Sequence, residues 1–453
     1  LYDRQPEKIN HNTLLELVID LYEAGDYAQG ITLAEKWVKQ QNVSRQEDIY
    51  PLVYYYIAYG YQNLHRKENT EQANCYMTMY VTLGENAAAD GCFPHRTEDY
   101  IVLKSLAEEY HLAMAYYYLG CLLYDRRVYD ESIEDYEESI LRSPDFPTVH
   151  RNLALAYYNV KKLPQRAYEE MEKAFALDET DARVYLELDQ LKKRLNVAVK
   201  ERWSDMEKHF DLVESRDDLY LEYVTLLNTL GEPEKALGLI KARKFHQWEG
   251  GEGKVAAQYL TALYQLAKAA VEKEDYAEAK ELLLRAVGEY PHNLGEGKLE
   301  SGQENNLYYL LGLVQEKLGE AKDAFESLTR ACCGESEPVG MMYYNDQPPE
   351  MIYYQGLAYR MLGEEEQAVR RFQKLVDYGR EHIRDDVKID YFAVSLPDLL
   401  IFEENLNERN RKHCLFMMSL GLKGLGRIDE AEKCAEELLA MDNAHQEIRV
   451  HDL

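Results

Sequence analysis

Apolar residues recur at helical spacing along this chain, in pairs of neighbouring segments. In the clearest pair, residues 115–124 are mostly apolar, and residues 129–140 carry acidic side chains around an apolar stripe. Apolar positions spaced three or four residues apart are typical of a helix that buries one face. A polar turn at residues 125–128 separates the two segments, and Pro144 ends the second because proline cannot extend a helix. The pattern predicts a helical hairpin.

Small residues stand where the two helices of this hairpin have to approach each other. Gly120 follows Leu119 in the first segment, and Ser132 takes the facing position in the second. This spacing resembles the tetratricopeptide repeat, a helical hairpin of about 34 residues. One such hairpin cannot bury both of its faces, so neighbouring repeats are expected.

The same pattern returns along most of the chain. Further hairpins are predicted at residues 14–38, 51–84, 147–174, 219–240, 255–291, 306–331, 351–376 and 413–439, with a degenerate one at 181–210. We therefore predict an all-α fold, one continuous right-handed α-solenoid of about ten to twelve hairpins. Within it we place N-terminal degenerate repeats at residues 1–96, central repeats at 97–215, and C-terminal repeats with inserted loops at 216–453.

Some segments depart from the repeat. A plain hairpin does not require the stretches Cys92–Arg96, Lys244–Lys254 and Tyr391–Asp398, so we expect any specific function to lie there. Residues 241–254 are the candidate hinge. The tail, Glu447–Leu453, is expected to be a cap or a frayed end.

The net charge of the chain indicates which kinds of partner it can bind. Among 453 residues, Asp and Glu number 82 against 52 Lys and Arg, a formal net charge of -30. Binding to nucleic acid or to an anionic membrane needs clustered cations, so neither partner is expected. The excess of acid indicates either a preference for basic partners or simply a well-solvated surface. No apolar run approaches the roughly 20 residues of a transmembrane helix.

Seven cysteines occur, an odd number with no Cys-x-x-Cys pair, which argues against a disulfide framework and against a zinc module. A reducing cytoplasm is the expected setting. The chain starts Leu-Tyr-Asp-Arg, without an initiator Met or a secretion signal, so we expect a fragment or a processed product. No metal or cofactor motif is present in the sequence, and neither is expected.

Tyrosine is the compositional outlier, with 38 residues. When the repeats are aligned, some tyrosines share columns on the first helix of each hairpin, and Arg and Asn take the same columns in one repeat. Such a surface suits stacking on a peptide or a sugar; the alternative is that the repeat helices simply pack large aromatics. The candidate groove residues are Tyr117, Tyr118, Arg151, Asn152, Tyr309, Tyr353 and Tyr354.

Two loops add further candidates. His246, Trp248, Glu249 and Glu252 combine an aromatic platform with carboxylates, a set suited to sugars and able to do acid–base work. The alternative is an ordered loop in which Trp248 plugs between hairpins and glycines permit tight turns. His95 and Arg96 could contact an anionic or polyol ligand, with packing of the neighbouring Phe93 against the next helix as the alternative.

The stretches Cys92–Asp99, Pro144–Asn159, Phe245–Lys254 and Asp390–Asp398 resemble the C-terminal repeat region of a large uncharacterised bacterial family. That family carries an N-terminal β-rich domain of carbohydrate-enzyme-like type. The resemblance implies that this chain is the repeat half of a carbohydrate-related protein and that its irregular loops touch the missing domain. A catalytic centre in the β-rich part cannot be transferred to these residues.

Our leading hypothesis is a non-catalytic binding and scaffold module that mediates protein–protein or interdomain contacts. Its partner would be a protein, a peptide or its own N-terminal domain. The alternative is that its loops complete the active site of a glycoside-processing enzyme, with carbohydrate as the ligand. No catalytic residue is assigned in this chain.

Overall fold

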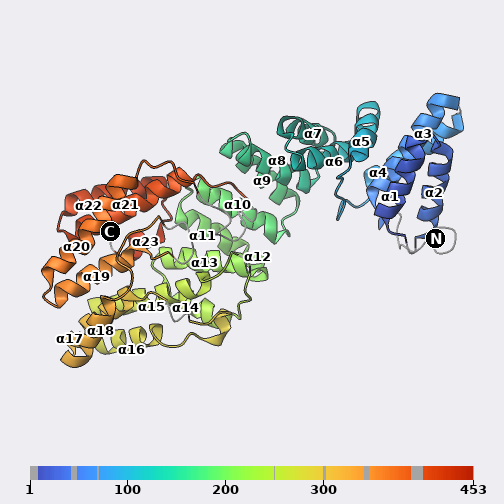
Figure 1. Ribbon diagram of the computed structural model, residues 1–453. Coiled ribbons are helices and arrows are strands. Elements are labelled where there is room, and N and C mark those ends of the chain that lie inside the picture. Colours follow the sequence, from blue (N-terminus) through green and yellow to red (C-terminus); the bar gives the residue numbers. More distant parts are fainter. Residues whose placement is uncertain are drawn as a thin grey trace. The chain divides into compact units, whose positions relative to one another are not determined.

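The computed structural model describes residues 9–41, 48–68, 71–248, 250–298, 302–340, 346–388 and 401–451 (Figure 1). Throughout these ranges the regular elements are helices, and no strand occurs among them. The chain divides into two compact units, residues 1–179 and residues 180–453.

The first unit is a series of paired helices. Neighbouring helices pack as the hairpins α1/α2, α3/α4, α6/α7 and α8/α9, and α5 contacts α3 and α6. The helices are α1 (His11–Glu23), α2 (Tyr27–Gln40), α3 (Pro51–Glu68), α4 (Glu71–Asn86), α5 (Thr97–Tyr110), α6 (Ala113–Asp125), α7 (Tyr129–Arg142), α8 (Pro147–Asn159) and α9 (Pro164–Leu177).

The second unit continues in the same manner. Its helices are α10 (Ala182–Arg194), α11 (Val199–Lys208), α12 (Phe210–Ser215), α13 (Asp217–Thr229), α14 (Pro233–Ala242), α15 (Lys254–Glu272), α16 (Tyr276–Ala286), the 3-10 turn η3 (His292–Leu294), α17 (Asn305–Lys317), α18 (Ala321–Ala331), α19 (Pro349–Met361), α20 (Glu365–His382), α21 (Leu406–Gly424), α22 (Ile428–Met441) and α23 (Gln446–Val450). The hairpins are α13/α14, α15/α16, α17/α18, α19/α20 and α21/α22, preceded by the looser pair α10/α11. The predicted all-α solenoid of helical hairpins is confirmed.

The clearest predicted hairpin shows why the small residues matter. A Cβ atom added to Gly120 would lie 2.5 Å from the ring of Tyr136 on the facing helix. Ser132 fits against the same place, and its hydroxyl donates to the Gly120 carbonyl at 2.7 Å. The same device recurs at Gly356, where an added Cβ would lie 2.4 Å from the Phe372 ring. Glycine therefore sets how closely the two helices approach.

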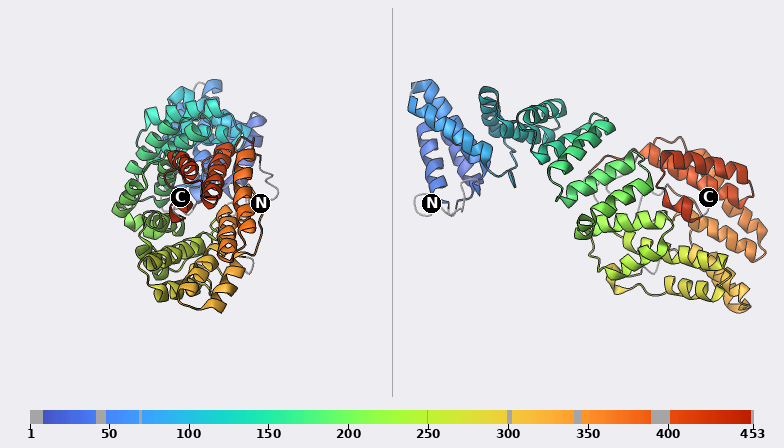
Figure 2. Two further views of the ribbon diagram at one scale, coloured as in Figure 1. Left: turned by 90° about the vertical axis from the view of Figure 1, so that its left-hand side faces the viewer. Right: turned by 180° about the vertical axis from the view of Figure 1, so that it is seen from behind.

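In the second unit the first helices of successive hairpins contact one another, in the order α13, α15, α17, α19 and α21. We call the surface that these helices share the inner face of the second unit. In a solenoid, such a face is the concave surface available for binding. Figure 1 labels α23 on the inner side of the arc formed by these helices, and the views in Figure 2 agree.

The two ends of the second unit meet. Asn196, in the turn between α10 and α11, donates from its side chain to the Ala440 carbonyl at 3.1 Å, and the Arg194 guanidinium donates to the Phe402 carbonyl at 3.2 Å. Asn443 completes the contact, donating from its backbone N–H to the Asn196 side chain at 2.8 Å. Nothing in the repeat pattern of the sequence predicts this closure, because it joins residues more than 200 positions apart.

Candidate functional site

The inner face of the second unit is occupied by a segment of its own chain. We call residues 442–451, which include α23, the inner segment. Its hydrogen-bond partners lie on the first helices α13, α15, α19 and α21 and in the α10/α11 turn. Of the two alternatives expected for Glu447–Leu453, the frayed end is wrong for the residues described, because Ile448, Val450 and His451 are buried.

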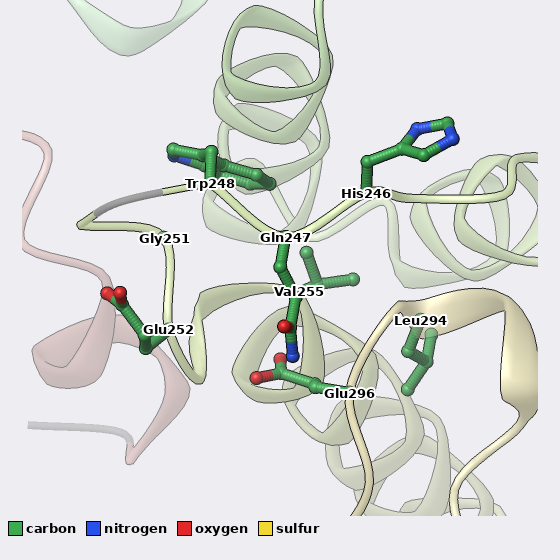
Figure 3. Close-up of a pocket in the computed structure, with 8 residues that line it drawn as sticks. All are labelled: His246, Gln247, Trp248, Gly251, Glu252, Val255, Leu294 and Glu296. Carbon is green, nitrogen blue, oxygen red and sulfur yellow. The ribbon is translucent and has the colours of Figure 1, made fainter.

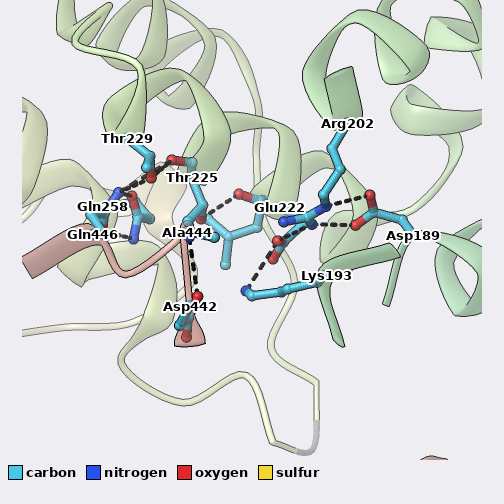
Figure 4. A network of polar contacts seen from close by, with 11 residues as sticks. Asp189, Lys193, Arg202, Glu222, Thr225, Thr229, Gln258, Asp442, Ala444 and Gln446 are labelled. Carbon is cyan, nitrogen blue, oxygen red and sulfur yellow. Dashed lines mark hydrogen bonds and ion pairs between the residues drawn. The ribbon is translucent and has the colours of Figure 1, made fainter. Parts of the chain in front are cut away.

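A polar clamp holds Gln446 (Figure 4). Its side-chain amide donates to the Thr225 carbonyl, the Thr229 hydroxyl and the Gln258 side-chain oxygen, each at 3.2 Å. In return, the Gln258 amide nitrogen donates to the Gln446 side-chain oxygen at 2.9 Å. Asn228 orients Gln258 by donating to its side-chain oxygen at 2.9 Å. The clamp satisfies both ends of one buried amide, which is how a protein surface selects a Gln or Asn side chain.

The other end of the inner segment meets a tyrosine from the predicted groove. The hydroxyl of Tyr354 shares a hydrogen bond of 2.9 Å with His451 Nδ1 and one of 2.6 Å with the Tyr264 hydroxyl. Lys268 donates to the Val450 carbonyl at 2.8 Å. Burial, with Lys268 nearby, lowers the pKa of His451 to about 3, so the ring is neutral near pH 7.

The other groove candidates of the second unit lie beside Tyr354. Tyr353 and Tyr354 are buried, with ring centroids 5.4 Å apart, and half-buried Tyr309 lies 5.5 Å from Tyr354. Tyr353 also packs 5.7 Å from Phe372, which fills the α19/α20 hairpin. These three tyrosines thus pack repeat helices together, and Tyr354 in addition contacts the inner segment.

In the first unit, the structure brings the groove candidates together on α6 and α8. Tyr117 and Tyr118 are buried, and Tyr117 packs edge-on against Phe146 at 4.9 Å. Arg151 and Asn152 are half-buried; the Arg151 guanidinium donates to the Asn152 side-chain oxygen at 3.1 Å. Arg151 and Asn152 are therefore the more accessible members of this set.

The glycine-rich loop before α15 forms a pocket of about 270 Å³ (Figure 3). It is lined by His246, Gln247, Trp248, Gly251, Glu252, Val255, Leu294 and Glu296. Three of the four residues predicted for this loop thus meet around one cavity, while Glu249 lies outside the described residues. The Trp248 ring covers Gly251 so closely that an added Cβ there would lie 2.3 Å from it.

Two acids that the sequence reasoning missed fix this loop. Asp217 accepts from the backbone N–H of His246 at 2.9 Å and from the Arg243 guanidinium at 2.6 Å. Although burial raises the pKa of Asp217, these hydrogen bonds lower it on balance. Glu296 accepts from the backbone N–H groups of Gly253 and Ala256, at 2.8 and 3.1 Å, and so caps the start of α15. Both acids are distant in sequence from the loop, so no local signal identifies them.

The remaining candidates, His95 and Arg96, lie at the start of α5. Both backbone N–H groups donate to Asp99, at 2.9 and 3.0 Å, and the Arg96 side chain donates to Glu16 on α1 at 2.6 Å. The His95 side chain is exposed, and Phe93 is 73% exposed instead of packing into the next helix. Asp99 was not predicted, and it organises this turn.

Within the described ranges, no group of three or more His, Cys, Asp or Glu side chains is placed to hold a metal ion. The seven cysteines are free thiols. No described helix is long and apolar enough to cross a membrane. The loop Tyr391–Asp398, singled out from the sequence, lies outside the described residues.

Known repeat proteins resemble parts of this chain. A family model described as tetratricopeptide repeat matches residues 117–182 and 264–338, and a second tetratricopeptide-repeat model matches residues 350–378. Among solved structures, YrrB, described as a TPR protein with an unusual peptide-binding site, is 18% identical over 41% of this chain and 90% of that chain, with a TM-score of 0.31. A tetratricopeptide repeat protein from Parabacteroides merdae is 14% identical over 67% of this chain and 98% of its own, with a TM-score of 0.25.

Yeast Tom70 is 10% identical over 99% of this chain and 88% of that chain, with a TM-score of 0.31. The family matches fall on the hairpins α6/α7, α8/α9, α15/α16, α17/α18 and α19/α20. Residues 117–182, 264–338 and 350–378 of this chain are therefore tetratricopeptide repeats.

Proposed function

We propose that this chain is a non-catalytic scaffold module that binds segments of other proteins on the first helices of its repeats. One observation carries the proposal: the inner face of the second unit holds a peptide segment through side chains drawn from several hairpins. A surface that seats one short segment by a buried amide and aliphatic side chains has the chemistry of a peptide-binding groove. In the first unit, Arg151 and Asn152 offer polar groups on the corresponding helix α8.

The test uses the full chain and two charge-matched variants. Arg151→Glu alters the candidate groove of the first unit, whereas Lys173→Glu makes the same change on the second helix α9, where the Lys173 side chain is 58% exposed. Proteins crosslinked to each variant in cell extract are quantified by mass spectrometry. We expect at least one partner that is lost with Arg151→Glu and retained with Lys173→Glu. Identical sets for all three proteins contradict binding through α8.

A second candidate function concerns the loop pocket. We propose that the cavity around His246, Trp248 and Glu252 binds a carbohydrate, since a Trp ring beside a carboxylate supplies both a stacking surface and hydrogen-bond acceptors. The specific support is that three residues chosen from the sequence line one cavity. In the fuller version of this proposal, the loop completes the active site of a glycoside-processing enzyme whose β-rich domain precedes this chain.

Glycan binding by Trp248→Ala tests the second candidate. Phe325→Ala is the matched control, because Phe325 is an aromatic residue on α18 that is 62% exposed. We expect only Trp248→Ala to lose binding on a glycan array. In a longer protein with glycosidase activity, Glu252→Gln should also lower turnover; unchanged binding and turnover in both loop variants contradict this function.

We also propose that the chain resides in the cytoplasm. Its seven free thiols support this, because oxidising compartments favour disulfides. Fractionation of cells that produce the protein, with a thiol-alkylation assay on the recovered chain, tests the assignment. Recovery of the chain in oxidised form outside the cytoplasm contradicts it.

A further inference from the structure

We propose that the inner segment is a displaceable internal ligand, and that a segment of another protein with the same side-chain pattern takes its place. The pattern is an amide side chain followed, two and four positions later, by branched aliphatic side chains, within one short helical turn. This inference rests on the proposed scaffold function and specifies the partner for one of its surfaces.

We call the residues of the inner face that contact the inner segment the seat. The seat binds particular side chains of this segment. Gln446 is 7% exposed and lies in the clamp of Thr225, Thr229 and Gln258, while Ile448 and Val450 are also buried. Arg449, between the two aliphatic residues, is exposed. Because residues two positions apart on a helix point to different sides, the protein surrounds Gln446, Ile448 and Val450 and leaves Arg449 to solvent.

The segment depends on the inner face for its own structure. The helix α23 contains only residues 446–450, and so short a helix is not stable by itself in water. The hairpin α21/α22, by contrast, packs through its own two helices and against α20. Release of residues 446–451 therefore costs the contacts of the seat and leaves the adjoining hairpin intact.

One acid of the inner segment interacts electrostatically with an acid of α19. Glu350, in the first turn of α19, is buried, and its pKa is raised to about 8 by burial and by the charge of Glu447 on α23. The charge of Glu447 disfavours only the ionised form of Glu350, and a segment without an acid at this position avoids that interaction. The chain thus carries a version of the motif that a better-matched partner can displace.

A foreign segment fits these observations better than the same segment from a second copy of the chain. The connection between α22 and α23 is itself anchored, because the Asn443 side chain donates to the Asn196 carbonyl at 2.6 Å. An exchange between copies has to open this anchor as well. A foreign peptide has to displace only residues 446–451, although it competes against a tethered segment whose effective concentration is in the millimolar range.

The experiment measures binding of a fluorescein-labelled peptide, with the sequence of residues 442–451 but Gln in place of Glu447, to the full chain. Gln446→Ala and Ile448→Asp weaken the internal segment, and Arg449→Ala is the control on the exposed side of the same helix. We expect the peptide to bind both weakened variants at least about tenfold more tightly than wild type or the control, a difference of about 1.4 kcal/mol. Absence of binding to variants that keep the wild-type circular dichroism spectrum overturns the proposal.

Two further measurements keep the test decisive if Ile448→Asp fails to fold. In wild type, hydrogen exchange of residues 446–451 should be faster than that of α21, which shows release without global unfolding. If residues 446–451 and α21 exchange only when the whole protein unfolds, the proposal is overturned. Sedimentation should show a monomeric wild type; a dimer that Gln446→Ala dissociates assigns the seat to a second copy and overturns it too. Loss of peptide binding leaves the Arg151→Glu experiment, and hence the scaffold function of the first unit, unaffected.

Discussion

The hairpins α6/α7 and α10/α11 have the same helix–turn–helix form, yet different forces hold them. In α6/α7 the packing of Gly120 against Tyr136 brings the two helices together. In α10/α11 the fully buried Arg202 side chain donates to Asp189 at 2.9 and 2.6 Å and to Glu222 of α13 at 2.7 Å (Figure 4). Although burial raises it, Lys193 and Arg202 lower the pKa of Glu222 to about 2.

The difference shows that the polar hairpin, and not the regular one, lies next to the residues that bind the inner segment. The turn of the polar hairpin contains Asn196, which receives Asn443 of the inner segment, and Glu222 lies one helical turn from Thr225 in the Gln446 clamp. A regular repeat stacks equally well on any neighbour of its kind. Fixed hydrogen-bonding groups, by contrast, select a particular segment at a particular place.

Arg202→Met is expected to have the largest effect, because it removes the cation paired with the buried Asp189 carboxylate and one of the two cations paired with Glu222. We expect a loss of about 3–5 kcal/mol in the free energy of unfolding, measured by urea denaturation. The exposed neighbour Lys200→Met should change it by less than about 0.5 kcal/mol. Equal effects for the two variants contradict the view that the ion network holds α10/α11.

Glu350→Gln tests a second acid, because burial and the charge of Glu447 raise the pKa of Glu350 to about 8, opposite in direction to the pKa shift of Glu222. In wild type the folded state therefore holds a proton that the unfolded state releases, so stability is full below about pH 4.5 and falls as the pH rises towards 8. The fall is on the order of 4 kcal/mol, and Glu350→Gln should remove it. Thermal unfolding at pH 5 and pH 8 measures this; a wild type as stable at pH 8 as at pH 5 contradicts it.

Gly120→Ala tests the apolar hairpin. The new methyl group would lie 2.5 Å from the Tyr136 ring, so we expect a loss of about 1–3 kcal/mol. The control is Gly238→Ala in α14, where an added Cβ meets nothing within 4 Å. Because Ala is the better helix former, the control should gain roughly 0.5–1 kcal/mol. Chemical denaturation of both variants checks that the two substitutions have opposite signs.

Asn443→Ala is expected to have the smallest effect, because it removes one anchor of the inner segment and leaves the core intact. A loss of about 1 kcal/mol is typical for one hydrogen bond. We expect faster hydrogen exchange at residues 443–451, with unchanged exchange in α15. A uniform increase along the whole second unit would show that the anchor supports the fold and not the segment alone.

The packing within each repeat could be predicted because it depends on residues that are close together in the sequence. Gly120 and Ser132 stand at fixed offsets within one hairpin, and their contacts confirm the packing expected of them. The loop residues His246, Trp248 and Glu252 could be chosen because they lie close together in the sequence. Asp217 and Glu296, which fix that loop, could not, because each comes from another element.

The sequence by itself determined the helical hairpins of this protein, since apolar spacing and small residues act within a few helical turns. Only the tertiary structure decided what covers the inner face of the second unit. The contacts of Gln446 with Thr225, Thr229 and Gln258 join residues about 190 to 220 positions apart. The residues of such a clamp do not recur at a regular spacing in the sequence. They can therefore be identified only in the folded structure, where they lie within about 3 Å of one another.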